Sequence, residues 1–176
     1  MDGIQPLTAP VSDADFRELA RLLVDAVDSG ASVSFMAPLA LDRAEAWWRD
    51  TIASARKGAV VLVARDDEGI VGSVQMHPAW PPNQPHRADI AKLIVHRRGR
   101  RRGLATSLMS AVEEAARAGG YTLLTLDTVP DTPADKLYRQ LGWTPVGRIP
   151  GYALDPAGVM CDTMVFYKKI EPDRTR

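Results

Sequence analysis

The sequence lacks most of the features that mark secreted, membrane-spanning or disulfide-linked proteins. Its 176 residues include a single cysteine, Cys161, so no internal disulfide can form. No apolar run approaches the ~20 residues needed to span a bilayer, and residues 1–10 lack the charged and then apolar order of a signal peptide. We therefore expect a soluble, cytoplasmic protein with no membrane partner.

An excess of charge of either sign is also missing. The 22 Lys and Arg residues balance the 22 Asp and Glu residues, so the formal net charge is zero. The surface of a chain with this charge balance is not a polyanion-binding surface as a whole, so we expect no nucleic-acid partner. Any site that binds an anion must be local. The His, Cys, Asp and Glu residues do not show the spacing of a metal site, and we expect no bound metal.

What the sequence does contain is the composition and periodicity of one globular domain. Hydrophobic residues make up 45% and charged residues 25%, both ordinary values. We predict a single domain over residues 1–170 and a short tail at 171–176. Apolar residues recur first at helical spacing and then in short runs, which favours an α/β fold with a mixed sheet in the order β-α-α-β-β-β-α-β-α-β-β. The predicted strands cover residues 4–8, 59–64, 70–77, 87–96, 121–127, 143–147 and 162–167, and the predicted helices begin after Ser12, near Asp42, at Arg101 and at Pro133.

The passage from the strand at 87–96 into the helix at 101–118 is the strongest local feature. A helix N-terminus has unpaired N–H groups and a partial positive charge, and it binds phosphates readily. The arginines just before this helix, which add bidentate phosphate donors, are Arg97, Arg98, Arg100, Arg101 and Arg102. Gly103 and Ala105 are small, so a ligand can approach the backbone closely. The pattern indicates a pyrophosphate site, although a solvated basic run or a nucleic-acid contact has a similar composition.

Two motifs in this region resemble those of the GNAT superfamily of N-acetyltransferases. Arg100-x-x-Gly103-x-Ala105 after a strand resembles the R/Q-x-x-G-x-G/A motif. The segment from Ala134 to Trp143 is similar to the N-x-x-A-x-x-L/F-Y-x-x-x-G-F/Y segment that follows in that superfamily. The resemblance implies a GNAT-type fold, with a mixed, mostly antiparallel sheet flanked by helices. It also implies an acyltransferase that moves an acetyl group from acetyl-coenzyme A (acetyl-CoA) to a primary amine.

The same resemblance implies which residues bind acetyl-CoA. They are Ile94, Val95, Arg100, Arg101, Arg102, Gly103, Leu104, Ala105, Thr106, Ala134 and Leu137. Two positions depart from the family pattern. Asp131 stands where many members have asparagine, which puts in question a side-chain contact to the pantetheine arm. Arg101 stands where glycine is common, so we expect this turn to reach the pyrophosphate without a positive φ or to shift slightly.

The resemblance gives Tyr138 and Asp127 chemical roles. Tyr138 matches the tyrosine that protonates the departing thiolate, and a tyrosine of ordinary pKa ~10 holds a proton that a thiol of pKa ~8.5 has lost. Asp127 matches an aspartate that acts as a base or only orients the amine, and the backbone N–H near Val95 would face the thioester carbonyl. Three alternatives stay open: a purely core role for Tyr138, a turn-capping role for Asp127, and His77 as the base.

In this superfamily the first two helices and the loop between them shape the acceptor pocket. The residues implied for this pocket are Ser34, Phe35, Met36, Trp47, Met76 and Tyr152, the last in a predicted loop at 150–152. Neighbours on a helix point about 100° apart, so we expect Trp47 or Trp48 to belong to the core instead.

Three segments, 30–36, 126–128 and 147–152, resemble the acetyltransferases that confer resistance to tabtoxin, a β-lactam amino-acid toxin. This resemblance favours a small-molecule amine as acceptor, such as an amino-acid-like toxin or antibiotic. The alternatives are a protein or peptide amine, and a regulatory acyl-CoA-binding domain without turnover. Tyr138 argues against the regulatory domain, because a sensor needs no acid there. Dimers are common in the superfamily, so a homodimer stays open.

Overall fold

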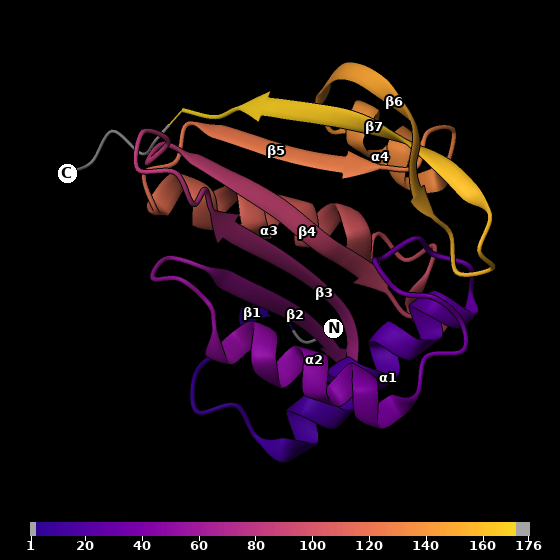
Figure 1. Ribbon diagram of the computed structural model, residues 1–176. Helices are drawn as coiled ribbons and strands as arrows, with labels where there is room; N and C mark the ends of the chain where they lie inside the picture. Colours follow the sequence, from indigo (N-terminus) through magenta and orange to yellow (C-terminus); the bar gives the residue numbers. More distant parts are fainter. Residues whose placement is uncertain (1–2, 172–176) are drawn as a thin grey trace.

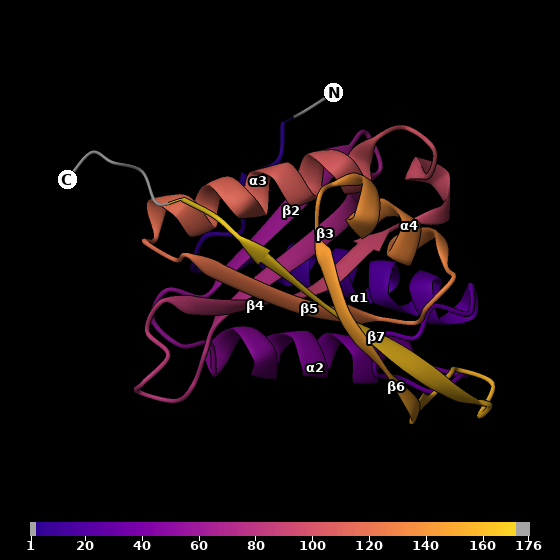
Figure 2. The same ribbon diagram turned by 90° about the horizontal axis from the view of Figure 1, so that it is seen from above.

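The computed structural model describes residues 3–171 as one seven-stranded sheet with helices on both faces (Figures 1 and 2). In chain order the elements are β1 (Gln5–Pro6), α1 (Asp13–Asp28), α2 (Leu41–Ala53), β2 (Val60–Asp66), β3 (Gly69–Pro78), β4 (Arg87–Val95), the 3-10 turn η1 (Arg97–Gly99), α3 (Leu104–Ala118), β5 (Leu123–Thr128), α4 (Pro133–Gln140), β6 (Thr144–Leu154) and β7 (Met160–Lys169). The strands lie in the order β1-β2-β3-β4-β5-β7-β6, and only the β4–β5 pair is parallel. The predicted α/β class and order of elements are confirmed.

Helices α1 and α2 cover one half of one sheet face (Figure 2). Ser12 Oγ accepts a hydrogen bond from the N–H of Asp15 at 3.1 Å, so α1 begins at the predicted cap. The apolar stripe of α1 packs with Trp48 of α2 and with strand residues such as Val63 and Ile94. Because the strand residues of this cluster come from β2, β3 and β4, the two helices are held over that half of the sheet.

Helix α3 covers the other face and carries the larger core. Its residues Leu108 and Val112 are fully buried against β3, β4 and β5. Glu113, also buried, accepts hydrogen bonds from Trp143 Nε1 at 3.1 Å and from Lys168 Nζ at 2.7 and 2.8 Å. A buried carboxylate requires such partners, and this one ties α3 to β7 and to the turn that follows α4.

Strands β4 and β5 pair over only three residues and then separate. The last pair is Asp89 with Thr125. Opposite the single residue Val74 of β3, β4 has two residues, Lys92 and Leu93, and Lys92 has a φ of 50°. A bulge of this kind bends and twists its strand. β4 therefore turns away from β5, and the two strands diverge toward α4 (Figure 1).

Several element boundaries differ from the prediction. The first strand has two residues instead of five. Helix α3 begins at Leu104 instead of Arg101, because the residues before it form η1 and a tight turn. Strand β6 continues to Leu154 through the segment predicted as a loop at 150–152. There the N–H of Gly151 donates to Asp162 Oδ1 at 2.8 Å, so the segment forms a bulge held against β7.

The C-terminal limit of the domain stays a prediction. β7 ends at Lys169, next to the predicted limit at residue 170. Residues 172–176 of the predicted tail lie outside the described residues. In the part of the chain that the structure describes, no helix has both the length and the apolar character to cross a membrane.

Candidate active site

The N-terminus of α3 has no side chain to cap it. Its N-cap is Gly103, with a φ of 77° and no capping hydrogen bond. The first N–H groups of the helix are therefore left for a ligand, and such a helix end attracts anions. A Cβ on Gly103 would meet no atom within 4 Å, so the approach is open. Arg101 has a φ of 62°, so the first of the two alternatives expected for this turn, that it avoids a positive φ, is wrong: the residue takes the conformation that glycine adopts more easily.

The arginines before α3 divide into structural and exposed ones. Arg97 donates from its backbone N–H at 2.9 Å, and from its guanidinium, to the buried carboxylate of Asp25 on α1. Arg98 donates through two nitrogens, each at 3.1 Å, to the carboxylate of Asp66 at the end of β2. Arg101 and Arg102 are exposed and form no salt bridge within residues 3–171. Arg97 and Arg98 thus fix the turn, while Arg101 and Arg102 expose the kind of group that binds phosphate.

The end of β4 directs backbone groups into the gap beside β5. The N–H of His96 donates to Val71 O of β3 at 2.9 Å. Since successive N–H groups along a strand point to opposite edges, the N–H of Val95 points away from β3, toward the diverging β5. Arg100 Nε donates to Val95 O at 3.2 Å. This is the edge at which the sequence predicts the thioester carbonyl.

The other residues predicted to bind acetyl-CoA lie on both sides of this gap. The first turn of α3 contains Leu104, Ala105 and Thr106, and α4 contains Ala134 and Leu137. Ile94 is different, because its side chain is buried in the α1 core and, by the same alternation, its backbone N–H points to β3. Asp131, the position that departs from asparagine, has an exposed side chain. The uncapped helix, the exposed arginines and the diverging strands fit a ligand with a pyrophosphate and a narrow arm, as acetyl-CoA has.

Tyr138 projects from α4 into the core beside this gap. Its ring centroid lies 6.1 Å from that of Trp143 and 5.9 Å from that of Phe166, and its side chain is buried. Burial first, and then the charge of Asp127, raises the pKa of the Tyr138 hydroxyl. The hydroxyl therefore stays protonated at neutral pH, as a proton donor requires. A side chain can therefore pack its ring in the core and keep a protonated hydroxyl at the same time.

Asp127 lies near the end of β5 on the face opposite α3. Its neighbour Leu126 points into the α3 core, so the alternation of the strand turns Asp127 to the other face, where it is exposed. Thr163 Oγ1 of β7 donates to Asp127 Oδ2 at 2.8 Å. Within residues 3–171, no backbone N–H donates to this carboxylate, so the turn-capping alternative has no support.

His77 of β3 lies on the same face and is the second candidate base. Its Nε2 is 2.8 Å from Gln75 Oε1, and its ring is half-buried. Burial lowers the pKa of His77, although the nearby carboxylate of Asp89 acts in the opposite direction. The ring is therefore largely neutral at pH 7 and able to accept a proton.

The loop between α1 and α2 reaches this face of β4. Lys92 Nζ donates to Ser34 Oγ at 3.0 Å and lies 5.3 Å from the Trp47 ring centroid. Phe35 meets Trp47 edge-on at 5.3 Å, whereas Trp48 is fully buried in the core. The expectation that one of the two tryptophans is core is confirmed. The loop also brings three predicted acceptor residues, Ser34, Phe35 and Trp47, into one cluster.

The same loop is joined to the β6–β7 hairpin. The N–H of Ala37 donates to Pro156 O at 2.9 Å. Met36, predicted to line the acceptor pocket, is exposed beside this contact. In Figure 1 the loop and the hairpin meet at the right-hand end of the sheet. The exposed face of β4 and β5 is therefore bordered by two segments that are hydrogen-bonded to each other.

Two predicted acceptor residues do not join this group. Met76 is 1% exposed and packs in the α3 core, because the alternation of β3 gives the acceptor face to Gln75 and His77. The prediction that Met76 lines the acceptor pocket is wrong. Tyr152 is 56% exposed in the bulge of the edge strand β6, so it is not part of a loop wall.

Sequence reasoning missed Lys92 and Thr163. Lys92 carries a signal that could have identified it, since a charged residue interrupts the apolar half of a predicted strand and is followed by three apolar residues in a row. Such a break in alternation is typical of a bulge. Thr163 carries no comparable signal, because only the pairing of β5 with β7 brings it to Asp127.

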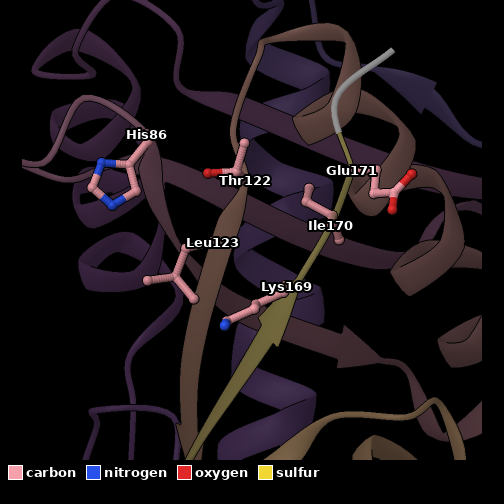
Figure 3. Close-up of a pocket in the computed structure, with 6 residues that line it drawn as sticks. All are labelled: His86, Thr122, Leu123, Lys169, Ile170 and Glu171. Carbon is pink, nitrogen blue, oxygen red and sulfur yellow. The ribbon is translucent and has the colours of Figure 1, made fainter. Parts of the chain in front are cut away.

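A hollow at the opposite end of β5 is separate from this arrangement. It is lined by His86, Thr122, Leu123, Lys169, Ile170 and Glu171 (Figure 3). Leu123 begins β5, whereas Asp127 lies near the end of that strand. Within residues 3–171, no group of three or more His, Cys, Asp or Glu side chains is placed to hold a metal ion.

Comparison with known families decides the identity of the chain. The model of the Acetyltransferase (GNAT) family matches residues 22–143, which include the α3 turn, Asp127 and Tyr138. The chain belongs to the GNAT acetyltransferase family. It is an acetyl-CoA-dependent N-acetyltransferase.

Two sequence relatives and two solved structures agree with this assignment. This GNAT chain is 34% identical over 115 residues to an N-acetyltransferase from the hisH–hisA intergenic region of Azospirillum brasilense, covering 64% of this chain and 67% of that protein. It is 31% identical over 96 residues to human N-acetyltransferase 8, covering 53% and 42%. The fold matches the ribosomal-protein-alanine N-acetyltransferase of Brucella melitensis with a TM-score of 0.77 at 21% identity, over 95% and 99% of the chains. It matches the yncA acetyltransferase of Salmonella typhimurium, solved with its cofactor acetyl-CoA, with a TM-score of 0.76 at 17% identity, over 99% and 98%.

Proposed function

We propose that this GNAT enzyme acetylates a primary amine of a small molecule, with Tyr138 and Asp127 as its catalytic residues. One observation carries the proposal: β4 and β5 separate after Asp89, and the gap that they leave has the uncapped α3 N-terminus at one end and Asp127 on its open face. A donor in the gap and an amine on the open face would then approach each other from opposite sides of the strands.

The roles of the residues follow from their chemistry. A bound acetyl thioester would supply the electrophilic carbonyl. The Val95 N–H would donate to its oxygen as negative charge develops there. Asp127 would hold the acceptor ammonium and help to remove its proton, either directly or through water. Tyr138, kept protonated by burial, would return a proton to the sulfur as the C–N bond forms and the C–S bond breaks.

The border of the acceptor face favours a small molecule over a protein chain. The α1–α2 loop is hydrogen-bonded to the β6–β7 hairpin through Ala37 and Pro156, so the two segments close one side of this face. A peptide that crossed the face in an extended conformation would have to part them. The resemblance of residues 30–36 and 147–152 to the tabtoxin-resistance acetyltransferases favours an amino-acid-like toxin or antibiotic among the small amines.

The test is a screen of acceptors by thiol release from acetyl-CoA. The panel contains amino acids, β-lactam amino acids, polyamines and aminoglycosides, with peptides that have a free N-terminus as the competing class. We expect turnover with at least one small amine. Turnover with peptides alone would replace the small-molecule acceptor by a protein acceptor. Tight binding of acetyl-CoA with no turnover on any amine would favour the regulatory domain.

The role of Asp127 is tested by Asp127→Asn, with Asp67→Asn, in an exposed turn, as the matched control. We expect Asp127→Asn to lower kcat/KM for the acceptor by about tenfold or more and to change its dependence on pH. The control should behave like the unmodified enzyme. A normal pH–rate profile in Asp127→Asn would leave this residue only an orienting role and would move the base to His77 or to water.

A further inference from the structure

Lys92 occupies an unusual backbone position at the point where β4 leaves β5. It stands in the β4 bulge with a φ of 50°, and its hydrogen-bond partner Ser34 has a φ of 78°. Residues other than glycine rarely adopt this conformation, and it persists only where the surrounding structure holds it. The bulge and the α1–α2 loop therefore position this one lysine side chain together.

The ammonium of Lys92 has polar and aromatic neighbours but no carboxylate partner. Ser34 Oγ accepts from its Nζ at 3.0 Å, and the Trp47 ring lies beneath it at 5.3 Å. Among residues 3–171, no carboxylate oxygen lies within 4.0 Å of this nitrogen. The side chain is half-buried, and burial lowers the pKa of Lys92. A half-buried cation without a counter-ion is costly, and an anionic ligand would offset that cost.

Asp127 supplies the opposite charge on the same face. Asp89 of β4 is paired in register with Thr125 of β5. Asp127 lies two residues further along β5, so the side chains of Thr125 and Asp127 point to the same face of the sheet. The negative charge of Asp127 favours the charged form of Lys92, yet the two form no salt bridge. Arg87, the other cation of β4 on this face, is engaged by Asp89, Thr125 and Gln84. Lys92 and Asp127 are thus opposite charges on one face of the sheet that form no salt bridge with each other.

We propose that Lys92 binds a carboxylate of the acceptor while Asp127 receives its amine, so that the acceptor is an amino acid or a close analogue with both groups a few bonds apart. This inference rests on the proposed function, because it names the acceptor class of the same site. Lys92 is a specificity residue in this scheme. The Trp47 ring and Ser34 hold its ammonium in place, and the hydrocarbon part of the acceptor would lie against the aromatic cluster of Phe35 and Trp47.

The experiment compares each amino acid of a panel with its carboxamide and with its decarboxylated amine, at saturating acetyl-CoA. We expect kcat/KM to be about tenfold or more higher for the carboxylate form, the usual size of a charge-assisted hydrogen bond. Lys92→Met should abolish this preference by lowering kcat/KM for the carboxylate alone. Lys92→Arg should keep the preference for the carboxylate form, because arginine also carries a positive charge. If Lys92 acted as a base, arginine could not take over its role, and Lys92→Arg would lose activity.

Two further variants keep the test decisive. Lys92→Asn removes the charge with a residue that tolerates the left-handed backbone, and circular dichroism shows whether each variant is folded. Lys57→Met, in an exposed position after α2, is the matched control and should keep the preference. Equal rates for carboxylate and carboxamide, or an undiminished preference in Lys92→Met and Lys92→Asn, would overturn the inference and leave the proposed function standing. Absence of turnover with every small amine would overturn both.

Discussion

The donor side and the acceptor side of this active site are built in different ways. The phosphate-binding part of the donor side is one continuous stretch, 95–105, whose N–H groups, arginines and turn follow one another along the chain. The acceptor side gathers Ser34, Lys92, Asp127 and Thr163 from a loop and three strands. A site of the first kind is visible as a motif, whereas one of the second kind exists only after folding. Substitutions on one side should therefore leave the constants of the other side unchanged.

The largest effect is expected at Asp25, which anchors the donor turn from α1. Asp25→Ala removes the carboxylate that accepts hydrogen bonds from the backbone N–H and the guanidinium of Arg97. We expect the free energy of unfolding to fall by about 2 kcal/mol, less than for a fully buried pair because Arg97 is partly exposed. The KM for acetyl-CoA should rise, while the KM for the acceptor stays the same. Urea denaturation and initial rates measure these quantities, with Asp28→Ala, exposed at the end of α1, as the control. A parallel rise in both KM values would show that the two sides are coupled.

Tyr138→Phe should reduce the rate of acetyl transfer without changing the binding of acetyl-CoA or of the acceptor. We expect kcat to fall roughly tenfold or more, because the proton donor is lost, and the Kd of acetyl-CoA by calorimetry to stay the same, because the ring keeps its packing. Burial raises the pKa of Tyr138 above its ordinary value of 10.0. The protonated form therefore persists at higher pH, and the wild-type rate should not fall between pH 7 and 9 through loss of this proton. An unchanged kcat in Tyr138→Phe would leave the residue with a packing role only.

The double variant Arg101→Ala, Arg102→Ala should weaken the donor side alone. Neither arginine holds the turn, so the fold should tolerate the change. We expect the KM for acetyl-CoA to rise by about tenfold at low salt and by less at high salt, because exposed charges are screened. Arg21→Ala on α1 is the matched control. A similar loss with Arg21→Ala would mean that general charge, and not a local phosphate contact, attracts the donor.

The smallest effect is expected at His77, on the acceptor side. Burial lowers its pKa below the ordinary value of 6.5, so the unfolded chain binds a proton more readily than the folded one does. Stability should therefore fall as the pH drops through 6.5, and His77→Gln should reduce that fall. Thermal melts between pH 5 and 8 measure it. If His77→Gln also removes the acidic limb of kcat/KM, His77 and not Asp127 is the base.

The order of the elements and the donor turn could be predicted because each depends on a few neighbouring residues. Ser12 caps α1 through a neighbouring residue, and Gly103, the N-cap of α3, directly follows the arginines of the same turn. The face to which a strand residue points and the ends of the strands were harder to predict. Met76 was expected at the acceptor but points into the α3 core, since a strand residue can face either way and only the packed sheet decides. The segment 150–152 looks like a loop, but Asp162 holds it as a bulge of β6.

The sequence by itself determined the donor chemistry of this protein. The uncapped helix start, the arginines and Tyr138 lie within two short motifs. Each motif is formed by a local turn and the helix that follows it, and the parallel pairing of β4 with β5 brings the two motifs to the same end of the sheet. Only the tertiary structure decided the acceptor side. The bulge at Lys92 parts β4 from β5, the α1–α2 loop and helix α2 place Ser34 and Trp47 beside it, and the β5–β7 pairing brings Thr163 to Asp127. These contacts join residues far apart in the chain, so they form only when the sheet and both helical layers pack together.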